Sequence, residues 1–255
     1  MEELSKNRIK YIRQLSQKKF RKKEKRYIAE GAKIIEDLID GKHPIEMIYA
    51  SEEAYLQLQA KAKNNNIEII AISEASLEKV SQLTTASNAI AIIPFKEQFF
   101  CIEELNHKIA IALDNIQDPG NLGTIIRIAD WFGIDHILCS KDTVDVHNIK
   151  VIQATMGAIA RVEVHYLDLE EVLPHAHHAN IPVYGTFLEG ENIYNEQLSS
   201  NGIIVMGNEG KGISPKIESL IKSKITIPSF REEKGSESLN VAMATSIICS
   251  EFKRR

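Results

Sequence analysis

The sequence lacks a long hydrophobic run. No apolar stretch approaches the roughly 18 to 20 residues that a membrane-spanning helix needs. The first ten residues, MEELSKNRIK, contain no apolar segment of the kind that a secretory signal carries. We therefore expect a cytoplasmic protein with no membrane partner.

Cysteine is also scarce. The three cysteines, Cys101, Cys139 and Cys249, lie far apart, are odd in number and form no CxxC pair. This pattern suggests neither a disulfide framework nor a cysteine-based zinc site. We expect buried thiols in a reducing compartment.

The composition is that of a globular protein. The chain has 255 residues, of which 44% are hydrophobic and 26% charged, without an internal repeat or a low-complexity tract. This length suffices for one large domain or two ordinary ones.

Charge is distributed unevenly along the chain. The formal net charge is −4, yet residues 1–26 contain eleven Lys or Arg and only three Glu. The densest part, KKFRKKEKR at 18–26, predicts a surface that attracts nucleic-acid phosphates, although a solvated helix face is the alternative. Phe20 and Tyr27 beside it are expected in the core more readily than stacked on bases.

Residues 1–95 show strands alternating with helices, which indicates a small α/β domain. Apolar residues from Ile9 through Ile28 to Leu38 recur at near-helical spacing, and Gly41 and Pro44 end that helical region. The strands are expected at 45–51, 67–72 and 89–95, and the helices at 54–63 and 73–83, the latter capped by a serine.

A weaker stretch at 96–107 is expected to be a linker to a second α/β segment. That segment opens with the apolar run 108–115, typical of the middle of a parallel sheet. Further strands are expected at 135–140, 160–167, 181–187, 202–208 and 224–230. The last helix, from 238 onward with Ser238 as a plausible N-cap, is apolar nearly all round and must be buried against the sheet or a partner chain.

Three polar, glycine-bearing loops follow strands in this second segment, at 114–123, 206–214 and 227–240. Open α/β sheets place their ligand crevice where such loops lie, at the carboxyl ends of strands. The middle loop does not bind a triphosphate as a Walker A loop does, because Lys211 is followed by Gly212 instead of Ser or Thr. No G-x-G-x-x-G follows a strand, so a familiar dinucleotide site is excluded as well.

A histidine cluster at His175, His177 and His178 suggests a metal site at first sight. Only the first and third would share a helix face, and no Cys or acidic motif stands nearby. A solvated helix is the preferred interpretation.

The three loops carry a family resemblance. The sequences D-P-G-N-L-G-T-I-I-R, G-N-E-G-K-G-I-S and I-P followed by E-S-L-N-V-A resemble, in order, the three motifs of the SpoU-type RNA ribose 2′-O-methyltransferases of the SPOUT superfamily. The N-terminal segment, with its basic start and E-G-A-K-I-I-E, is similar to the small substrate-binding domain, related to a ribosomal-protein fold, that is often attached to these enzymes.

The resemblance implies an α/β fold in which 108–255 forms a mostly parallel sheet with a trefoil knot that binds S-adenosylmethionine (SAM). It implies that 1–95 is an RNA substrate-binding domain, that 96–107 is a linker, and that the protein is a homodimer through the knotted domain and final helix. The methyl of a sulfonium is electrophilic by itself, so no metal is expected in the chemistry.

The family's residues map onto this chain by motif. The positions that resemble its SAM contacts are Thr186, Gly207, Ile227 and Leu239. The positions that resemble its polar groups around the methyl and the target ribose are Arg127, Asn121, Glu209, Ser238 and Asn240. In the basic run, the residues expected to contact RNA are Lys18, Lys19, Arg21, Lys22 and Lys23.

Arg127 matches the residue implicated in activating the 2′-hydroxyl. Because a guanidinium has a pKa above about 12 and rarely accepts a proton, we expect Arg127 to orient a phosphate or stabilise the developing oxyanion. A neighbouring group or water would take the proton.

The stretch between Pro228 and Glu237 departs from the family by being charged and longer, with Ser229 where a Met is common. This affects the expected shape of the pocket at the methionine end of SAM. The two-domain layout favours ribosomal over transfer RNA as substrate. The alternatives are a non-catalytic RNA-binding protein that retains the fold and, disfavoured by motif spacing, a nucleotide hydrolase.

Overall fold

The computed structural model describes residues 2–231 and 238–254. The chain forms two compact units, Met1–Glu97 with Asp145–Arg161, and Gln98–Val144 with Val162–Arg255. The segment Asp145–Arg161 thus packs with the first unit, although it lies inside the range 108–255 expected for the second domain.

The first unit is built on a four-stranded sheet, as counted over the described residues, in the order β1-β4-β2-β3. Its strands are β1 (Arg26–Glu30), β4 (Ala89–Pro94), β2 (Met47–Ala50) and β3 (Glu68–Ala71). Strand β4 runs antiparallel to β1 and β2, and β2 pairs with β3 in parallel. One core cluster joins α1, α5 and this sheet and includes Ile12, Leu15, Ile28, Tyr49, Ile72, Leu77, Val80, Ile90 and Ile92.

Helices surround this sheet. They are α1 (Lys6–Gln14), α2 (Lys18–Glu24), α3 (Ala32–Asp40), α4 (Glu52–Asn64), α5 (Glu74–Val80), α7 (Ile149–Thr155) and the 3-10 helix η2 (Ala158–Ala160). Ser5, Ser51 and Ser73 each accept a hydrogen bond from the backbone N–H three residues on, which fixes where α1, α4 and α5 begin. The predicted serine cap at 73 and the end of α3 at Gly41 are confirmed.

The helical periodicity predicted through Ile28 is wrong. Helix α2 ends at Lys25, which adopts a left-handed conformation with φ of 51°, and the next five residues form β1. Tyr27, Ile28, Ala29 and Glu30 are buried in succession, so this segment is covered on both faces and has no amphipathic helical stripe. Tyr27 is a core residue, with only 1% of its surface exposed, as preferred from the sequence.

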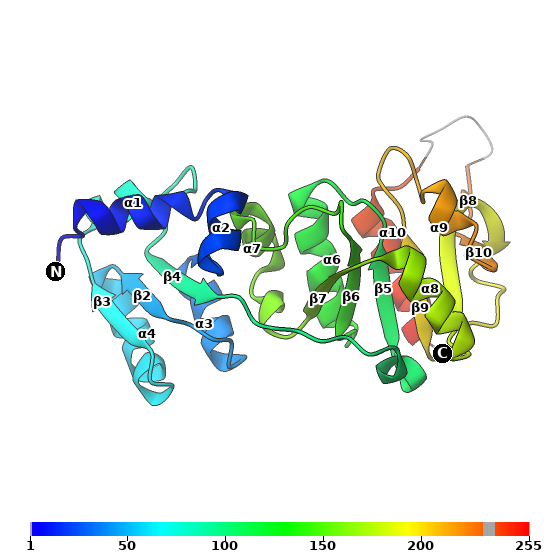
Figure 1. Ribbon diagram of the computed structural model, residues 1–255, viewed down its shortest axis with the longest axis horizontal. Coiled ribbons are helices and arrows are strands. Elements are labelled where there is room, and N and C mark those ends of the chain that lie inside the picture. The colour runs from blue at the N-terminus through cyan, green and yellow to red at the C-terminus, as the bar shows by residue number, and fades with distance from the viewer. Residues whose placement is uncertain (1, 232–237, 255) are drawn as a thin grey trace. The chain divides into compact units, whose positions relative to one another are not determined.

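The second unit is built on a six-stranded sheet, counted over the described residues, in the order β10-β8-β9-β5-β6-β7. Its strands are β5 (Ile109–Leu113), β6 (His136–Ser140), β7 (Glu163–Leu167), β8 (Val183–Asn192), β9 (Gly202–Met206) and β10 (Ser223–Thr226). Every pairing between them is parallel. The chain proceeds from β5 outward to β6 and β7, and then continues on the other side of β5 (Figure 1). The strand order therefore reverses between β5 and β9, as in doubly wound folds.

The helices of the second unit are η1 (Ile102–His107), α6 (Pro119–Trp131), α8 (Leu169–His178), α9 (Pro215–Glu218) and α10 (Val241–Lys253). Helices α6 and α10 pack against each other. Residues of η1, α8 and α9 join a second core cluster with the sheet, in which Leu105 and Leu173 are fully buried. The stretch 96–107 is therefore not a free linker throughout, because η1 packs into this core. In the part of the chain that the structure describes, no helix combines the length and apolar character needed to cross a membrane.

Side chains next to the first turn fix where helices α6 and α10 begin. Pro119 occupies the first turn of α6, and Asp118 accepts a hydrogen bond from Asn121 N as its N-cap. Helix α10 begins later than expected, because Asn240 is the N-cap and accepts bonds from Ala242 N and Met243 N. The predicted N-cap at Ser238 is therefore wrong.

The cysteines are free, as predicted, but only two of them are buried. Cys139 and Cys249 are buried, whereas Cys101 is exposed. Burial raises the pKa of the Cys249 thiol to about 12, because the apolar surroundings disfavour a thiolate.

Candidate active site

The site begins at the reversal point of the parallel sheet. The loop after β5 and the loop after β9 leave the sheet side by side, and Asp114 N donates a hydrogen bond to Met206 O at 2.9 Å. In open parallel sheets this point leaves a crevice at the carboxyl ends of the strands. Two of the three loops singled out in the sequence therefore meet at the place where such folds bind ligands.

The loop after β9 is closed on itself. Asn208 and Gly212 exchange two backbone hydrogen bonds of 2.9 Å. A Cβ added at Gly207 would lie 2.3 Å from the carbonyl carbon of Gly212, so only glycine allows this closure. The loop therefore presents backbone groups instead of a long side chain at residue 207.

Two polar side chains hold the first two loops together. Asn208 Nδ2 donates to Asn115 O at 2.8 Å, and its Oδ1 accepts from Gly210 N and Lys211 N at 3.0 Å each. Asp114 Oδ2 accepts from Ser214 N at 2.7 Å, and Asp114 is buried. Sequence reasoning did not assign Asn208 or Asp114 to the site. Asp114 could have been assigned to the site from the sequence, because its carboxylate directly follows the wholly apolar strand at 109–113.

One asparagine joins all three loops. Asn121 Nδ2 donates to Glu209 Oε1 at 2.9 Å, and Asn121 Oδ1 accepts from Asn240 Nδ2 at 2.9 Å. These three residues come from the first turn of α6, the loop after β9 and the start of α10. The structure thus brings together three of the five polar residues predicted for the site. We call this Glu209–Asn121–Asn240 group the amide bridge.

Of the four residues predicted to contact SAM, two directly follow strands, one lies within β8 and one directly precedes the cap of α10. Gly207 follows β9, and Ile227 follows β10. Thr186 follows Gly185, the last residue of β8 that pairs with β9, and its Oγ1 donates to Val205 O at 3.0 Å. Leu239 immediately precedes the helix cap Asn240, and 53% of its surface is exposed.

The chemistry of these residues suits SAM. Thr186 is partly buried and polar, Ile227 and Leu239 are apolar with exposed surface, and Gly207 leaves backbone groups approachable. Glu209 adds an exposed carboxylate in the same loop. Apolar surface suits an adenine ring and a carboxylate suits a cationic donor, so the residues fit this cofactor.

Arg127 and Ser238 are not joined to the amide bridge by any hydrogen bond between described residues. Arg127 is exposed on α6, six residues after Asn121, which places its backbone roughly 9 Å further along the helix. Ser238 is exposed and follows 232–237. Most of the departure noted between Pro228 and Glu237 falls on 232–237 and so lies outside the described residues.

Four lysines of the basic run are exposed on or beside α2: Lys18, Lys19, Lys22 and Lys23. Arg21 differs from them and corrects the expectation of a phosphate contact. Its guanidinium is buried, donates to Leu15 O and Ser16 O, and pairs with Asp145 Oδ2 at 2.7 Å. Arg21 thus holds the segment beginning at Asp145 to the first unit.

The histidine cluster of α8 lies in the last turn of that helix. His175 and His178 are exposed, and His177 Nε2 lies 2.7 Å from the Leu220 carbonyl. This agrees with the preferred interpretation of a largely solvated helix end.

Residues 108–250 match the SpoU rRNA Methylase family, and residues 6–91 match the MRM3-like substrate binding domain. The chain is 25% identical to the 23S rRNA (guanosine(2553)-2′-O)-methyltransferase RlmP of Bacillus subtilis over 249 residues, covering 97% of this chain and 96% of that protein.

Solved structures agree with the fold over nearly the full length. A TrmH-family protein from Porphyromonas gingivalis is 35% identical, with a TM-score of 0.89 and 99% of each chain covered. An AdoMet-bound rRNA methyltransferase from Sinorhizobium meliloti is 26% identical, with a TM-score of 0.85, covering 100% of this chain and 97% of that one. The matched residues, the parallel sheet and the order of the three loops lead to one conclusion: the chain belongs to the SpoU rRNA methylase family.

Proposed function

We propose that the protein transfers a methyl group from SAM to a ribose 2′-hydroxyl of structured RNA, and that this RNA is ribosomal. The observation that carries the proposal is the amide bridge, which ties the three family loops together beside the reversal point of the sheet. The Bacillus subtilis relative that aligns over almost the full chain is named for 23S rRNA, which supports ribosomal over transfer RNA.

Backbone groups around Gly207, together with Thr186, Ile227 and Leu239, would hold SAM beside the carboxyl ends of β9 and β10 and the point where β8 stops pairing with β9. When bound, this cofactor supplies a methyl group made electrophilic by its positive sulfur. The exposed Glu209 carboxylate is fixed by Asn121 and contributes negative charge on the same side. Two backbone hydrogen bonds between Asn208 and Gly212 close the loop beside Gly207.

Arg127 orients an RNA phosphate or stabilises the negative charge that develops on the 2′-oxygen. Asn121, Asn240 and Ser238 position the ribose, and a neighbouring group or water accepts the proton. The positive charge of Arg127 is the main rate-enhancing element of this scheme.

The first unit binds RNA. Lys18, Lys19, Lys22 and Lys23 are exposed within a stretch of six residues and supply phosphate contacts. The protein acts as a homodimer in the cytoplasm, with a knotted second domain and with α10 at the interface. Helix α10 packs against α6, and Met243 on α10 is 61% exposed, which supports an apolar contact surface on α10.

Two experiments test the proposal. Mapping 2′-O-methyl sites in RNA from cells with and without the protein should show one ribosomal position that loses its methyl group. Calorimetric titration of SAM into the purified protein should show binding. If SAM binds and no ribose methylation changes, the substrate assignment fails, and if SAM does not bind, the non-catalytic RNA-binding alternative is favoured.

A further inference from the structure

A separate group of polar side chains lies at the opposite end of the second unit's sheet. His136 is the first residue of β6, Glu163 is the first residue of β7, and the two pair across the strands. His165 lies two residues further along β7, hence on the same face as Glu163. These are the amino ends of parallel strands, whereas the proposed methyl-transfer site lies at the carboxyl ends.

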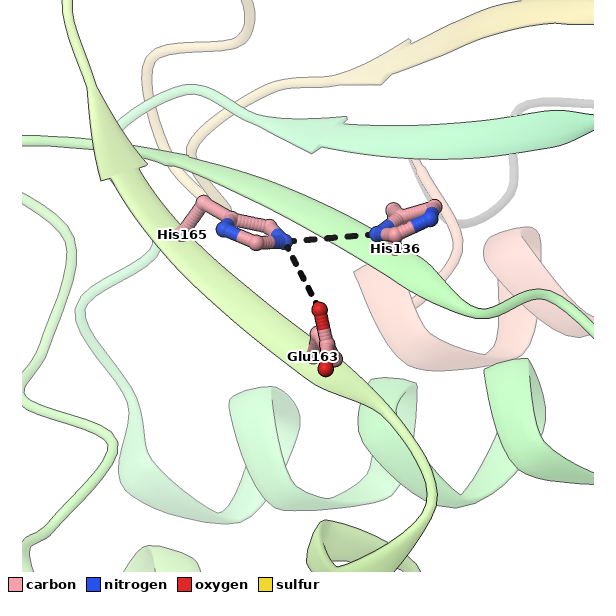
Figure 2. A group of neighbouring side chains, drawn as sticks. All are labelled: His136, Glu163 and His165. Atoms are coloured by element: carbon pink, nitrogen blue, oxygen red, sulfur yellow. Dashed lines mark hydrogen bonds and ion pairs between the residues drawn. The ribbon is translucent and has the colours of Figure 1, made fainter. Parts of the chain in front are cut away.

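The ligand atoms of these residues converge. His136 Nδ1 and His165 Nε2 are 3.3 Å apart, and Glu163 Oε2 is 3.8 Å from His165 Nε2 (Figure 2). One ligand atom from each residue lies within 4.8 Å of the others. Two imidazole nitrogens bound to a tetrahedral zinc ion at about 2.0 to 2.1 Å would themselves be separated by about 3.3 to 3.4 Å. The two rings are therefore already spaced as ligands of one ion.

The other nitrogen of His136 has its own carboxylate. Glu104 Oε2, from η1, lies 3.4 Å from His136 Nε2. A proton on Nε2 that faces Glu104 leaves the Nδ1 lone pair directed at His165. Metal-binding histidines commonly have such a carboxylate behind them, because it fixes the ring and raises its basicity.

The site is enclosed on its protein side. His136 and His165 are 4% and 5% exposed, and the ring of Phe100 lies 5.7 Å and 5.4 Å from theirs, measured between ring centres. The Glu163 side chain is 32% exposed, so the group retains access to solvent. An ion can enter past Glu163 and bind in a largely dry environment.

We propose that His136, His165 and Glu163 bind one divalent transition-metal ion of the zinc type, with water in a fourth position. Two imidazoles and a carboxylate are a donor set that suits zinc and cobalt better than magnesium or calcium. The ion would join β6 to the edge strand β7, and Glu104 would extend this link to η1. It stabilises the unit and takes no part in methyl transfer.

The test uses the full chain, stripped of metal by a chelator, and Zn²⁺ titrated against a competing dye. We expect one tight site per chain, and tetrahedral d–d bands when Co²⁺ replaces Zn²⁺. Glu163→Gln and Glu104→Gln should each weaken binding by about 10- to 100-fold, and His165→Gln should abolish the site. The matched control His175→Gln/His178→Gln removes two exposed histidines and should leave the tight site unchanged.

Thermal unfolding of the wild type and of Glu163→Gln provides a second test that does not require His165→Gln to fold. Zn²⁺ should raise the melting temperature of the wild type by several degrees, because it binds only the folded form, and should raise that of Glu163→Gln clearly less at the same Zn²⁺ concentration. Absence of a tight site in the wild type, or an equal site in Glu163→Gln and the wild type, would overturn the proposal. In that case a hydrogen bond, and not a metal ion, joins the rings of His136 and His165.

Discussion

Asn121 Oδ1 accepts a hydrogen bond of 2.9 Å from Asn240 Nδ2, 119 residues away in the sequence. The amide nitrogen of Asn121 donates a hydrogen bond to Glu209 Oε1. Because a side-chain amide has one donor end and one acceptor end, these two partners fix its orientation. The start of α10 and the loop after β9 are consequently aligned with α6 through a single side chain.

Asn121→Asp should lower methyl transfer by about 10- to 100-fold, which corresponds to about 1.4 to 2.7 kcal/mol. The new carboxylate cannot donate to Glu209 and adds a like charge beside it. Initial rates at saturating SAM and RNA measure the effect. Asn195→Asp, at an exposed position away from the bridge, is the matched control and should retain activity. Equal rates in both variants would contradict a role for the bridge.

The two roles of Asn240 can be separated. Asn240→Asp keeps the oxygen that caps α10 but loses the donor to Asn121, so stability should hold while activity falls. Asn240→Ala loses both, and its free energy of unfolding should fall by about 1 kcal/mol as well. Denaturant unfolding and the transfer assay are measured on both variants. An active Asn240→Asp would show that only the cap matters.

Much of the fold was readable from the sequence, because buried parallel strands and serine caps are local signals. Strand β1 was missed because Ile28 matches a helical spacing by chance, and its pairing with β4 depends on residues some 60 positions away. The grouping of Asn121, Glu209 and Asn240 followed from the family motifs and not from any local pattern. Arg21 was misassigned because its partner, Asp145, lies 124 residues away.

Arg21→Ala should destabilise the protein by about 1 to 3 kcal/mol, because the half-buried Asp145 carboxylate loses its guanidinium partner and the carbonyls of Leu15 and Ser16 lose their donor. Lys22→Ala, one position along and exposed, should change stability by less than about 0.5 kcal/mol. Urea unfolding compares the two. A similar small effect in both variants would argue that the ion pair is not important for stability.

The same pair predicts an acid-sensitive stability. Burial opposes the charge on Asp145, but hydrogen bonds from His147 and Arg21 outweigh it and hold the pKa of Asp145 well below its ordinary value. Its contribution is therefore complete above about pH 4, the unfolded pKa, and is lost as the pH falls below that. Asp145→Asn should flatten the stability curve in that range, and an unchanged slope would contradict the assignment.

His43 predicts a second pH window. Burial, followed by the charges of Lys96 and His147, lowers the pKa of His43 to about 4, and His43 Nε2 lies 2.9 Å from the Tyr27 hydroxyl. The folded protein keeps this ring neutral, so the unfolded chain binds more protons between about pH 6.5 and 4, and stability declines as the pH falls through that window. His43→Gln should remove this decline. A wild-type-like pH profile in the variant would exclude His43.

Replacing Lys18, Lys19, Lys22 and Lys23 by alanine should weaken RNA binding and reduce its salt dependence, because fewer counterions are released. Arg21 is left intact so that the fold is preserved. Affinities between 50 and 200 mM salt give the slope. A slope equal to that of the wild type would make these lysines a solvated helix face.

The most direct test is transfer of labelled methyl from SAM to unmodified ribosomal RNA by the purified protein, followed by digestion to nucleosides. The account predicts label in a single 2′-O-methylated nucleoside, and a loss of at least about 100-fold in Arg127→Ala with SAM affinity nearly unchanged. Label on a base, no label in RNA, or full activity in Arg127→Ala would contradict it.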